Sequence, residues 1–280
     1  MNIGIRLHDT APGTLEERLG FASAQGFSCA HVALSKVLPG FEMSRAPELL
    51  NDELADGVND AMKRAGLQCA VLGCYLSLAT PDAEELARTQ AVYKAHLKYA
   101  NRIGALVVGT ETPAAKSSKL DIMGCRSEEA FQLLLRNIRP VVRWAEEYGA
   151  ILAVEPVVSY IIYNSERAER LLTEVNSDAM QIILDPVNLL ASAELDQADA
   201  IFEEAMRRLG DRVRVLHMKD YRPAPENFRP DSIACGTGIM RYDALLSFAK
   251  RHDLPMTLED TTPENAEAAR KHLEAAAAAL

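Results

Sequence analysis

The sequence has no excess of positive charge. Its 280 residues include 30 Lys and Arg against 40 Asp and Glu, which gives a formal net charge of -10. This balance argues against a nucleic-acid-binding protein that relies on a generally basic surface. A local basic pocket for a small anionic substrate stays compatible with it.

Long apolar runs and cysteine pairs are also missing. No uninterrupted apolar stretch is long enough to span a bilayer, and no basic and apolar signal segment is found at the N-terminus. The five cysteines are an odd number, form no C-x-x-C pair and lie mostly in apolar runs. We therefore expect buried free thiols and a cytoplasmic protein without membrane association.

No segment rich in Pro, Gly and Ser interrupts the chain, so nothing in it resembles a linker between domains. Instead, short apolar runs alternate with longer amphipathic segments. The runs predict strands at 2–8, 27–34, 67–76, 105–111, 150–156, 180–186, 212–220 and 254–260. Helices are expected at 14–26, 46–66, 82–104, 127–149, from 165, at 196–210, at 242–252 and from 263.

Eight strand-then-helix units predict an α/β fold, a single-domain (β/α)8 TIM barrel over residues 1–280. The strands are nearly continuous in apolar character, as parallel strands buried on both sides should be. A doubly wound open sheet is the alternative. No G-x-G-x-x-G turn follows the first strand, so the dinucleotide-binding form of that alternative lacks support.

Four predicted strands end in groups that can bind a metal or transfer a proton. Strands five to eight end in Glu155, Asp185, His217 and Glu259, and active sites of (β/α)8 barrels lie at these strand ends. Strand alternation places each of the four on an inward face. Three ionised carboxylates confined together are disfavoured unless a divalent cation neutralises them. Carboxylates with one His suit Mn²⁺, Mg²⁺ or Co²⁺ better than a structural zinc ion.

Each of these residues has an ordinary explanation when taken alone. An acidic residue at a strand end commonly caps a helix or makes a loop ion pair, and a lone His is commonly a structural residue. Their occurrence on four consecutive strands, in register with one face, favours the metal site.

The same residues resemble the metal-binding set of the xylose-isomerase-like TIM barrels, a superfamily of sugar isomerases and epimerases, inosose dehydratases and endonuclease IV. The resemblance covers essentially the whole chain and rests on the segments VEP, ILDPVNL, HMKD, GTGIMRYDALL and MTLED. It implies that Glu155, Asp185, His217 and Glu259 bind a divalent metal, with Mn²⁺ expected and Mg²⁺, Co²⁺ or Zn²⁺ as alternatives. It also implies that Glu155 and Glu259 are catalytic and exchange protons with the substrate from opposite faces.

The activity that this resemblance implies is that of a metal-dependent sugar or sugar-phosphate isomerase or epimerase. Proton transfer would pass through a metal-bound enediolate. Loss of a β-hydroxyl on the same site would instead make the protein a lyase that dehydrates an inosose or keto-sugar. A non-catalytic carbohydrate-binding barrel is a further alternative. The expected partner is a small sugar or sugar phosphate, and the C-terminal helix is available to pair two subunits as a homodimer.

Several positions depart from patterns within this family. The free-ketose 3-epimerases carry a further Glu, His and Arg where this chain has Ile161, Asn188 and Pro223, so their specificity is not expected here. His31 stands where many members end strand two with Glu, which predicts a changed substrate contact. Endonuclease IV needs several more His and Asp ligands for three zinc ions, so DNA repair is not expected.

Other side chains near the strand ends are candidates for binding the substrate. Lys219 shares the strand face of His217, and its alternative role is an ion pair with a site carboxylate. Arg229 and the segment 114–121 add positive charge that suits a phosphate or carboxylate. The substrate-binding candidates are Glu111, Asn188, Lys219, His8, His31 and Arg222.

The remaining polar residues are given structural or minor roles. Tyr75 is expected to form an aromatic wall of the pocket, and Asp220 to organise the loop after strand seven. Gly236 and Gly238 would let backbone amides approach an anion. Three histidines in predicted helices are expected at the surface: His96, His252 and His272.

Overall fold

Eight parallel strands close into a barrel in the computed structural model, which describes residues 1–280. Their order around the ring follows the chain, and the last strand pairs with the first. The strands are β1 (Ile3–Arg6), β2 (Cys29–Val32), β3 (Gln68–Gly73), β4 (Val107–Glu111), β5 (Leu152–Glu155), β6 (Met180–Leu184), β7 (Val213–Met218) and β10 (Met256–Leu258). The predicted TIM barrel is therefore confirmed.

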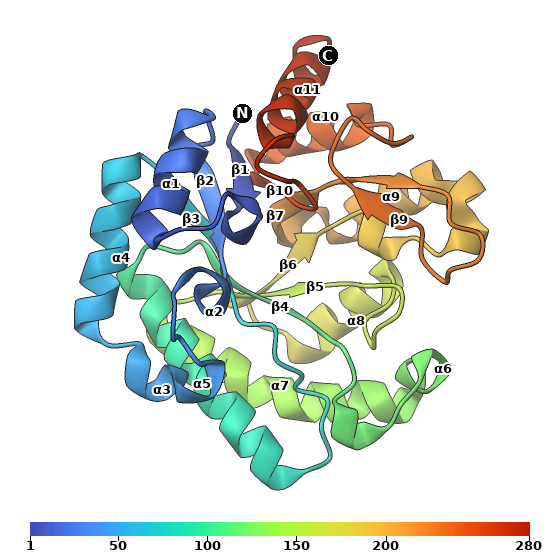
Figure 1. The fold of residues 1–280 in the computed structure, drawn as a ribbon. Coiled ribbons are helices and arrows are strands. Elements are labelled where there is room, and N and C mark those ends of the chain that lie inside the picture. Colours follow the sequence, from blue (N-terminus) through green and yellow to red (C-terminus); the bar gives the residue numbers. More distant parts are fainter.

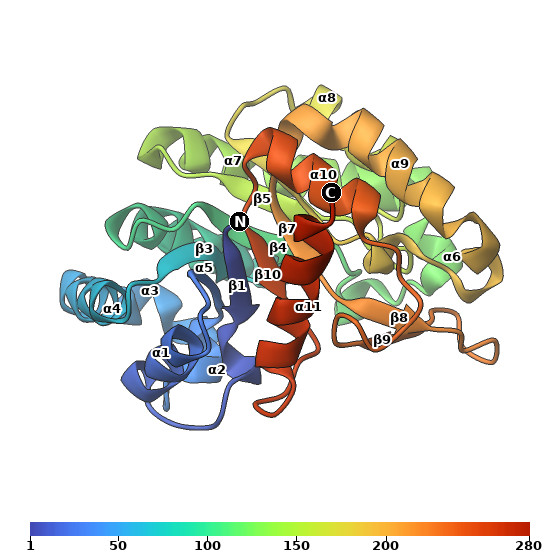
Figure 2. The ribbon, with the colours of Figure 1, turned by 90° about the horizontal axis from the view of Figure 1, so that it is seen from above.

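Helices surround the ring of strands, as Figures 1 and 2 show. In both views the N- and C-termini lie close together, beside β1 and the last helix. The longer helices are α1 (Leu15–Ala24), α4 (Asp52–Ala65), α5 (Ala83–Arg102), α7 (Glu128–Tyr148), α8 (Ser165–Val175), α9 (Ala198–Leu209), α10 (Asp243–His252) and α11 (Ala266–Ala278). Three short helices lie in the connections: α2 (Leu34–Val37), α3 (Ala46–Leu49) and α6 (Ile122–Cys125).

Capping side chains explain where several helices begin. Thr14 and Glu17 form a reciprocal capping box at the start of α1. Asn51 accepts a hydrogen bond from the backbone N–H of Leu54 and so begins α4. The helix predicted over 46–66 is therefore wrong in one respect: it is divided into α3 and α4, because the side chain of Asn51 caps a new helix at that point.

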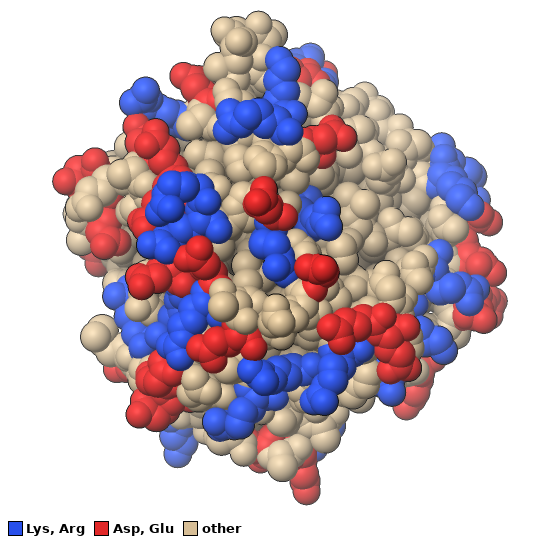
Figure 3. Space-filling model, turned by 180° about the vertical axis from the view of Figure 1, so that it is seen from behind, with Lys and Arg blue, Asp and Glu red and all other residues tan.

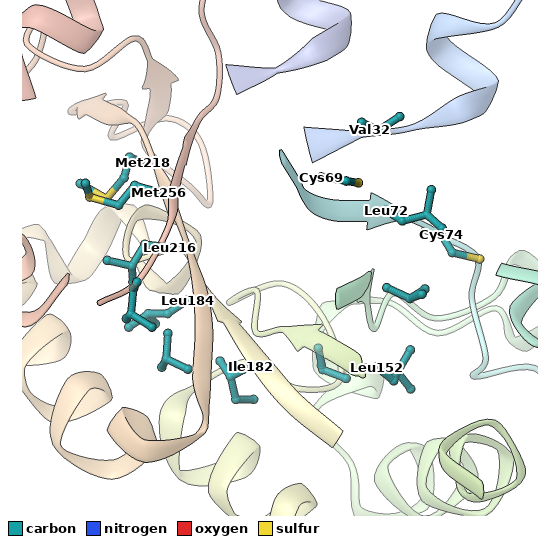
Figure 4. Packing of buried hydrophobic residues seen from close by; sticks show 14 of the residues in the cluster. Val32, Cys69, Leu72, Cys74, Leu152, Ile182, Leu184, Leu216, Met218 and Met256 are labelled. Carbon is teal, nitrogen blue, oxygen red and sulfur yellow. The ribbon is translucent and has the colours of Figure 1, made fainter. Parts of the chain in front are cut away.

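Two apolar layers hold the barrel together. A small inner cluster fills the barrel and includes Val71, Val107, Ala153, Ile183 and Val215. The larger cluster lies between the strands and the helices, and Figure 4 shows ten labelled members of it along the strands. Because strand residues alternate between these layers, the inner layer continues directly to Glu155, Asp185 and His217 at the strand ends.

A two-stranded antiparallel hairpin follows β7 at the carboxyl end of the barrel and was not predicted. Its strands are β8 (Asp220–Arg222) and β9 (Asp231–Ile233), with Tyr221 paired to Ser232. The hairpin extends from the ring of strands on the side of α9 in Figure 1. It brings the loop of residues 223–230 near the strand ends.

The distribution of surface charge and the state of the cysteines are as the amino-acid composition predicts. On the face in Figure 3, Lys and Arg groups are interspersed with Asp and Glu groups, and no continuous basic surface covers it. All five cysteines are buried free thiols, as expected. No helix of the structure has the length and apolar character that a membrane crossing requires.

One expectation about histidines is wrong. His252 and His272 are exposed, but His96 is fully buried on the inner side of α5. Its Nδ1 lies 2.9 Å from the carbonyl oxygen of Val92, one turn earlier in the helix. The helical position alone predicted a surface residue, whereas this backbone contact lets the imidazole pack inside.

Candidate active site

The four side chains that end β5, β6, β7 and β10 meet at one point. Asp185 and His217 have no exposed surface, and Glu155 and Glu259 are 2% and 6% exposed. Their ligand atoms all lie within 4.8 Å of one another. The structure thus brings together all four predicted metal ligands, because the carboxyl ends of neighbouring parallel strands share one edge of the barrel.

Two distances within this cluster are close to those between neighbouring donor atoms on a common ion. His217 Nδ1 lies 3.1 Å from Glu155 Oε2 and 3.2 Å from Glu259 Oε1. Neither nitrogen of His217 makes a hydrogen bond. Donors at 2.0–2.1 Å from an octahedral ion are about 3 Å apart along each edge. The donor set of three carboxylates and one imidazole therefore fits a divalent cation.

Two basic side chains compensate part of the negative charge. The Lys219 ammonium lies 2.9 Å from Asp185 Oδ2 and 3.4 Å from Glu259 Oε2. Arg6, at the end of β1, places its Nη1 3.5 Å from the same Glu259 oxygen. The ion pair that was the alternative role of Lys219 is thus present. Arg6 was not predicted as a site residue, although it ends a strand in the same way as the others.

The cluster shifts the pKa values of its members in different directions. Burial would raise the pKa of Glu259, but the positive charges of His217, Lys219 and Arg6 hold it well below its usual range. Burial raises the pKa of Asp185 to about 6 against the opposing effect of Lys219. Burial would lower the pKa of His217, but the Glu259 and Glu155 carboxylates raise it to about 9.

Asn188 lies at the centre of a hydrogen-bond network beside Glu155. It belongs to a turn of 3-10 helix after β6 (Val187–Leu189) and is buried. Its Nδ2 donates to Glu155 Oε1 at 2.6 Å, and its Oδ1 accepts from Lys219 Nζ at 3.1 Å and from Arg229. Its role as a substrate contact stays a prediction, since the amide oxygen and one amide N–H are already engaged within the chain.

The arginine that reaches the site from the hairpin is Arg229. Arg222 is exposed on β8, whereas Arg229 donates to Asn188 Oδ1 from the hairpin loop. The substrate-binding role predicted for Arg222 is therefore not supported by its position. Arg229 was expected to add positive charge near the strand ends, but the hairpin that brings it to Asn188 was not predicted.

A pocket of about 290 Å³ opens beside the four-residue cluster. Glu155 and Glu259 form part of its wall, together with Glu111, His8, His31 and Tyr75. Burial, with the added repulsion of Glu155 and Glu259, raises the pKa of Glu111 to about 8. Burial and the nearby Arg6 lower the pKa of His8 to about 4. The pocket thus joins the cluster to three of the predicted substrate contacts.

Two glycines leave room for ring side chains in the barrel mouth. A Cβ at Gly73 would lie 2.9 Å from both His31 Nε2 and a ring carbon of Tyr75. A Cβ at Gly109 would lie 3.2 Å from the Tyr75 hydroxyl oxygen. The Tyr75 hydroxyl is buried without a hydrogen-bond partner. Tyr75 lines the pocket, so the predicted aromatic wall is present.

Asp220 has the structural role that was expected of it. Its carboxylate accepts hydrogen bonds from the backbone N–H groups of Tyr221, Gly236, Gly238 and Met240, at 2.8 to 3.1 Å. The backbone N–H groups of Gly236 and Gly238 do bind an anionic group, as predicted, but this group belongs to the chain itself. The anion is the Asp220 side chain and not a ligand.

The sequence of residues 20–278 matches the profile of the family described as Xylose isomerase-like TIM barrel, and the chain belongs to this family. A search of the curated proteins found no significant match.

Three solved structures with the same fold illustrate the functions and ligands of similar proteins. An apo 3-keto-D-glucoside 4-epimerase, YcjR from E. coli, is 18% identical, with a TM-score of 0.73 and coverage of 98% of this chain and 99% of that one. The IOLI protein with a bound zinc atom is 20% identical, with a TM-score of 0.71 and coverage of 99% and 96%. The probable 3-DHS dehydratase AsbF from Bacillus anthracis is 14% identical, with a TM-score of 0.71 and coverage of 98% of both chains.

Proposed function

We propose that this chain is a metal-dependent isomerase or epimerase of a sugar or sugar phosphate. One observation carries the proposal. Glu155 and Glu259 both contact one imidazole nitrogen, at 3.1 and 3.2 Å from His217 Nδ1, and both line the same pocket. Two carboxylates at the same pocket can act as an acid and base pair: one removes a proton from a substrate carbon, and the other returns a proton to the opposite face of that carbon or to the neighbouring carbon.

Glu155, Asp185, His217 and Glu259 would hold a divalent cation. When bound, such a cation would polarise a carbonyl and a neighbouring hydroxyl of the substrate and so make the adjacent C–H more acidic. Three carboxylates favour Mn²⁺ or Mg²⁺. The zinc in the similar IOLI structure keeps Zn²⁺ among the alternatives.

Side chains of the chain itself hold the two proton-transfer groups in place. Asn188 fixes one oxygen of Glu155 with a 2.6 Å hydrogen bond, which leaves Oε2 directed toward His217. Arg6 and Lys219 both contact Oε2 of Glu259. Each carboxylate thus keeps one oxygen on a fixed partner and has the other oxygen in the cluster. A carboxylate held in a fixed orientation transfers a proton more readily than one that rotates freely.

The alternative is a dehydratase on the same residues, and Glu111 favours it. In the metal-free protein, burial and the repulsion of Glu155 and Glu259 raise the pKa of Glu111 to about 8, which favours a neutral carboxylic acid at pH 7 in the wall of the pocket. A neutral acid can protonate a departing hydroxyl group. The fold shared with the probable 3-DHS dehydratase AsbF is compatible with such chemistry.

Isotope exchange tests the proposal and separates the two reactions. Protein purified without chelator is analysed for metals and incubated in D₂O with ketoses, ketose phosphates, a 3-keto-D-glucoside and an inosose. Epimerisation or isomerisation gives deuterium at one carbon without loss of water, whereas dehydration gives an unsaturated or diketo product with new ultraviolet absorbance. Glu259→Gln should keep the fold and abolish exchange. Absence of divalent metal, or full exchange in Glu259→Gln, would overturn the proposal.

A further inference from the structure

We propose that His31 is an additional ligand of the metal centre, so that two imidazoles and not one face the ion. The inference rests on the proposed metal dependence. It begins from a second group of close ligand atoms in the structure: His31, His217 and Glu259 also lie within 4.8 Å of one another. This group shares two members with the four-residue cluster and adds a side chain from the opposite part of the ring, on β2.

The surroundings of His31 leave its nitrogens without an ordinary role. The residue is 2% exposed, both ring nitrogens are shielded from solvent, and neither makes a hydrogen bond. Leaving a buried polar atom unpaired costs free energy, so an imidazole with two such atoms is unfavourable as a purely structural residue. A bound ligand would remove part of that cost.

The ring packing of His31 directs Nδ1 toward the cluster. The imidazole is stacked on that of His217, with centroids 5.2 Å apart and planes at 13°, and it also packs on Tyr75 at 5.6 Å. Nε2 lies against β3, since a Cβ at Gly73 would be 2.9 Å from it. Nδ1 lies 3.9 Å from Glu259 Oε1, the same oxygen that is 3.2 Å from His217 Nδ1. The two Nδ1 atoms therefore approach one carboxylate oxygen from neighbouring rings.

The burial of both His31 nitrogens favours metal binding by this residue over a contact with the substrate. His31 lines the pocket, but its nitrogens are not accessible from it. A substrate hydroxyl would have to displace the ring to reach them, whereas an ion held by His217 and Glu259 would lie among atoms that His31 already faces. A second imidazole also changes metal preference, because nitrogen donors suit Zn²⁺ and Co²⁺ whereas oxygen donors suit Mn²⁺ and Mg²⁺.

The decisive variant is His31→Phe, which keeps a ring against His217 and Tyr75 but removes both nitrogens. Dissociation constants for Zn²⁺, Co²⁺ and Mn²⁺ are measured by competition with a chromophoric chelator. We expect Zn²⁺ and Co²⁺ to bind about 10- to 100-fold more weakly than in the wild type, with a smaller change for Mn²⁺. The matched control is His8→Phe, which alters the neighbouring pocket wall 6.2 Å from His31 and belongs to neither ligand group. Its metal affinities should equal those of the wild type.

X-ray absorption of the Zn²⁺-loaded wild type gives an answer that needs no variant. Outer-shell scattering should correspond to two imidazoles, and to one in His31→Phe. A single imidazole in the wild type, or unchanged Zn²⁺ affinity in His31→Phe, would overturn the role of His31. If Asp185→Asn still weakens metal binding in that case, the proposed metal-dependent function stands without it. A wild-type protein that binds no divalent metal would overturn both.

Discussion

The side-chain amide of Asn188 donates a 2.6 Å hydrogen bond to Oε1 of Glu155, while its oxygen accepts from Lys219 and Arg229. Two cations on the oxygen fix which end of the amide faces Glu155. The network therefore connects three parts of the chain: the strand end of β5, the turn after β6 and the hairpin after β7. Through it, a residue on the hairpin loop influences the orientation of a proposed catalytic carboxylate.

Replacing Asn188 by Ala should reduce kcat more than it weakens metal binding. The hydrogen bond to an ionised carboxylate is worth about 1.5–3 kcal/mol, which corresponds to a loss of roughly 10- to 150-fold if all of it acts in the transition state. Steady-state kinetics on the substrate found by isotope exchange, together with metal titration, checks this. Arg229→Ala serves as a milder comparison, because Lys219 still holds the amide. Equal kcat in the wild type and Asn188→Ala would show that Glu155 needs no such support.

Metal binding should release protons and become tighter as the pH rises. In the metal-free protein the carboxylates raise the pKa of His217 to about 9, so its imidazole is protonated at pH 7. Only the neutral imidazole binds a metal. The apparent dissociation constant should therefore fall by about tenfold per pH unit for each proton released, up to about pH 9. Calorimetry in buffers of different ionisation enthalpy counts the protons. A dissociation constant that is flat from pH 6 to 8.5 would contradict the assignment of His217.

The barrel could be predicted from the sequence because its signal is repeated and local. Every barrel strand lies in a short apolar run and most helices end at a cap or a glycine, so each unit supports the same interpretation. Glu155, Asp185, His217 and Glu259 could be predicted for the same reason. Each directly continues an apolar strand, and strand alternation fixes the face on which it lies.

The rest of the site depends on contacts that no local pattern encodes. Arg229 is brought to Asn188 by a hairpin whose strands have only three residues each. His31 and Tyr75 meet because Gly73 and Gly109 lack side chains on neighbouring strands. Asn188 looked like a substrate contact, and its three partners come from residues 31 to 41 positions away. Such contacts are set by the closed barrel and not by spacing along the chain.

Replacing Glu111 by Gln should change how the stability of the metal-free protein depends on pH. Burial and two neighbouring carboxylates raise the pKa of Glu111 from 4.5 to about 8. A group with a raised pKa in the folded state contributes stability below its unfolded pKa, and this contribution is lost as the pH rises through the folded pKa. Glu111→Gln should thus be more stable than the wild type at pH 9 but not at pH 4. Thermal unfolding with chelator present measures the difference, and identical pH profiles for the two proteins would contradict it.

Replacing Asp220 by Ala should destabilise the hairpin and, through it, the site. Its two oxygens accept from four backbone amides, and the loop is shaped for them. Gly236 has a φ of 80°, and a Cβ at Gly238 would lie 2.4 Å from Asp220 Oδ1. Removing a charged acceptor that is buried should lower the free energy of unfolding by about 3 kcal/mol or more.

Hydrogen exchange locates this effect. In Asp220→Ala the amides of Gly236, Gly238 and Met240 should exchange much faster than in the wild type. The exchange rates of amides in β3 and β4, on the opposite side of the barrel, should change only as far as the global free energy of unfolding changes. Because the hairpin carries Arg229 to Asn188 and Ser232 to Asp260, kcat should fall as well. Asp220→Asn, which keeps one acceptor oxygen, should give an intermediate result in all three measurements. Fast exchange confined to these amides with unchanged kcat would show that the hairpin is stabilised by Asp220 but is not needed to position Glu155.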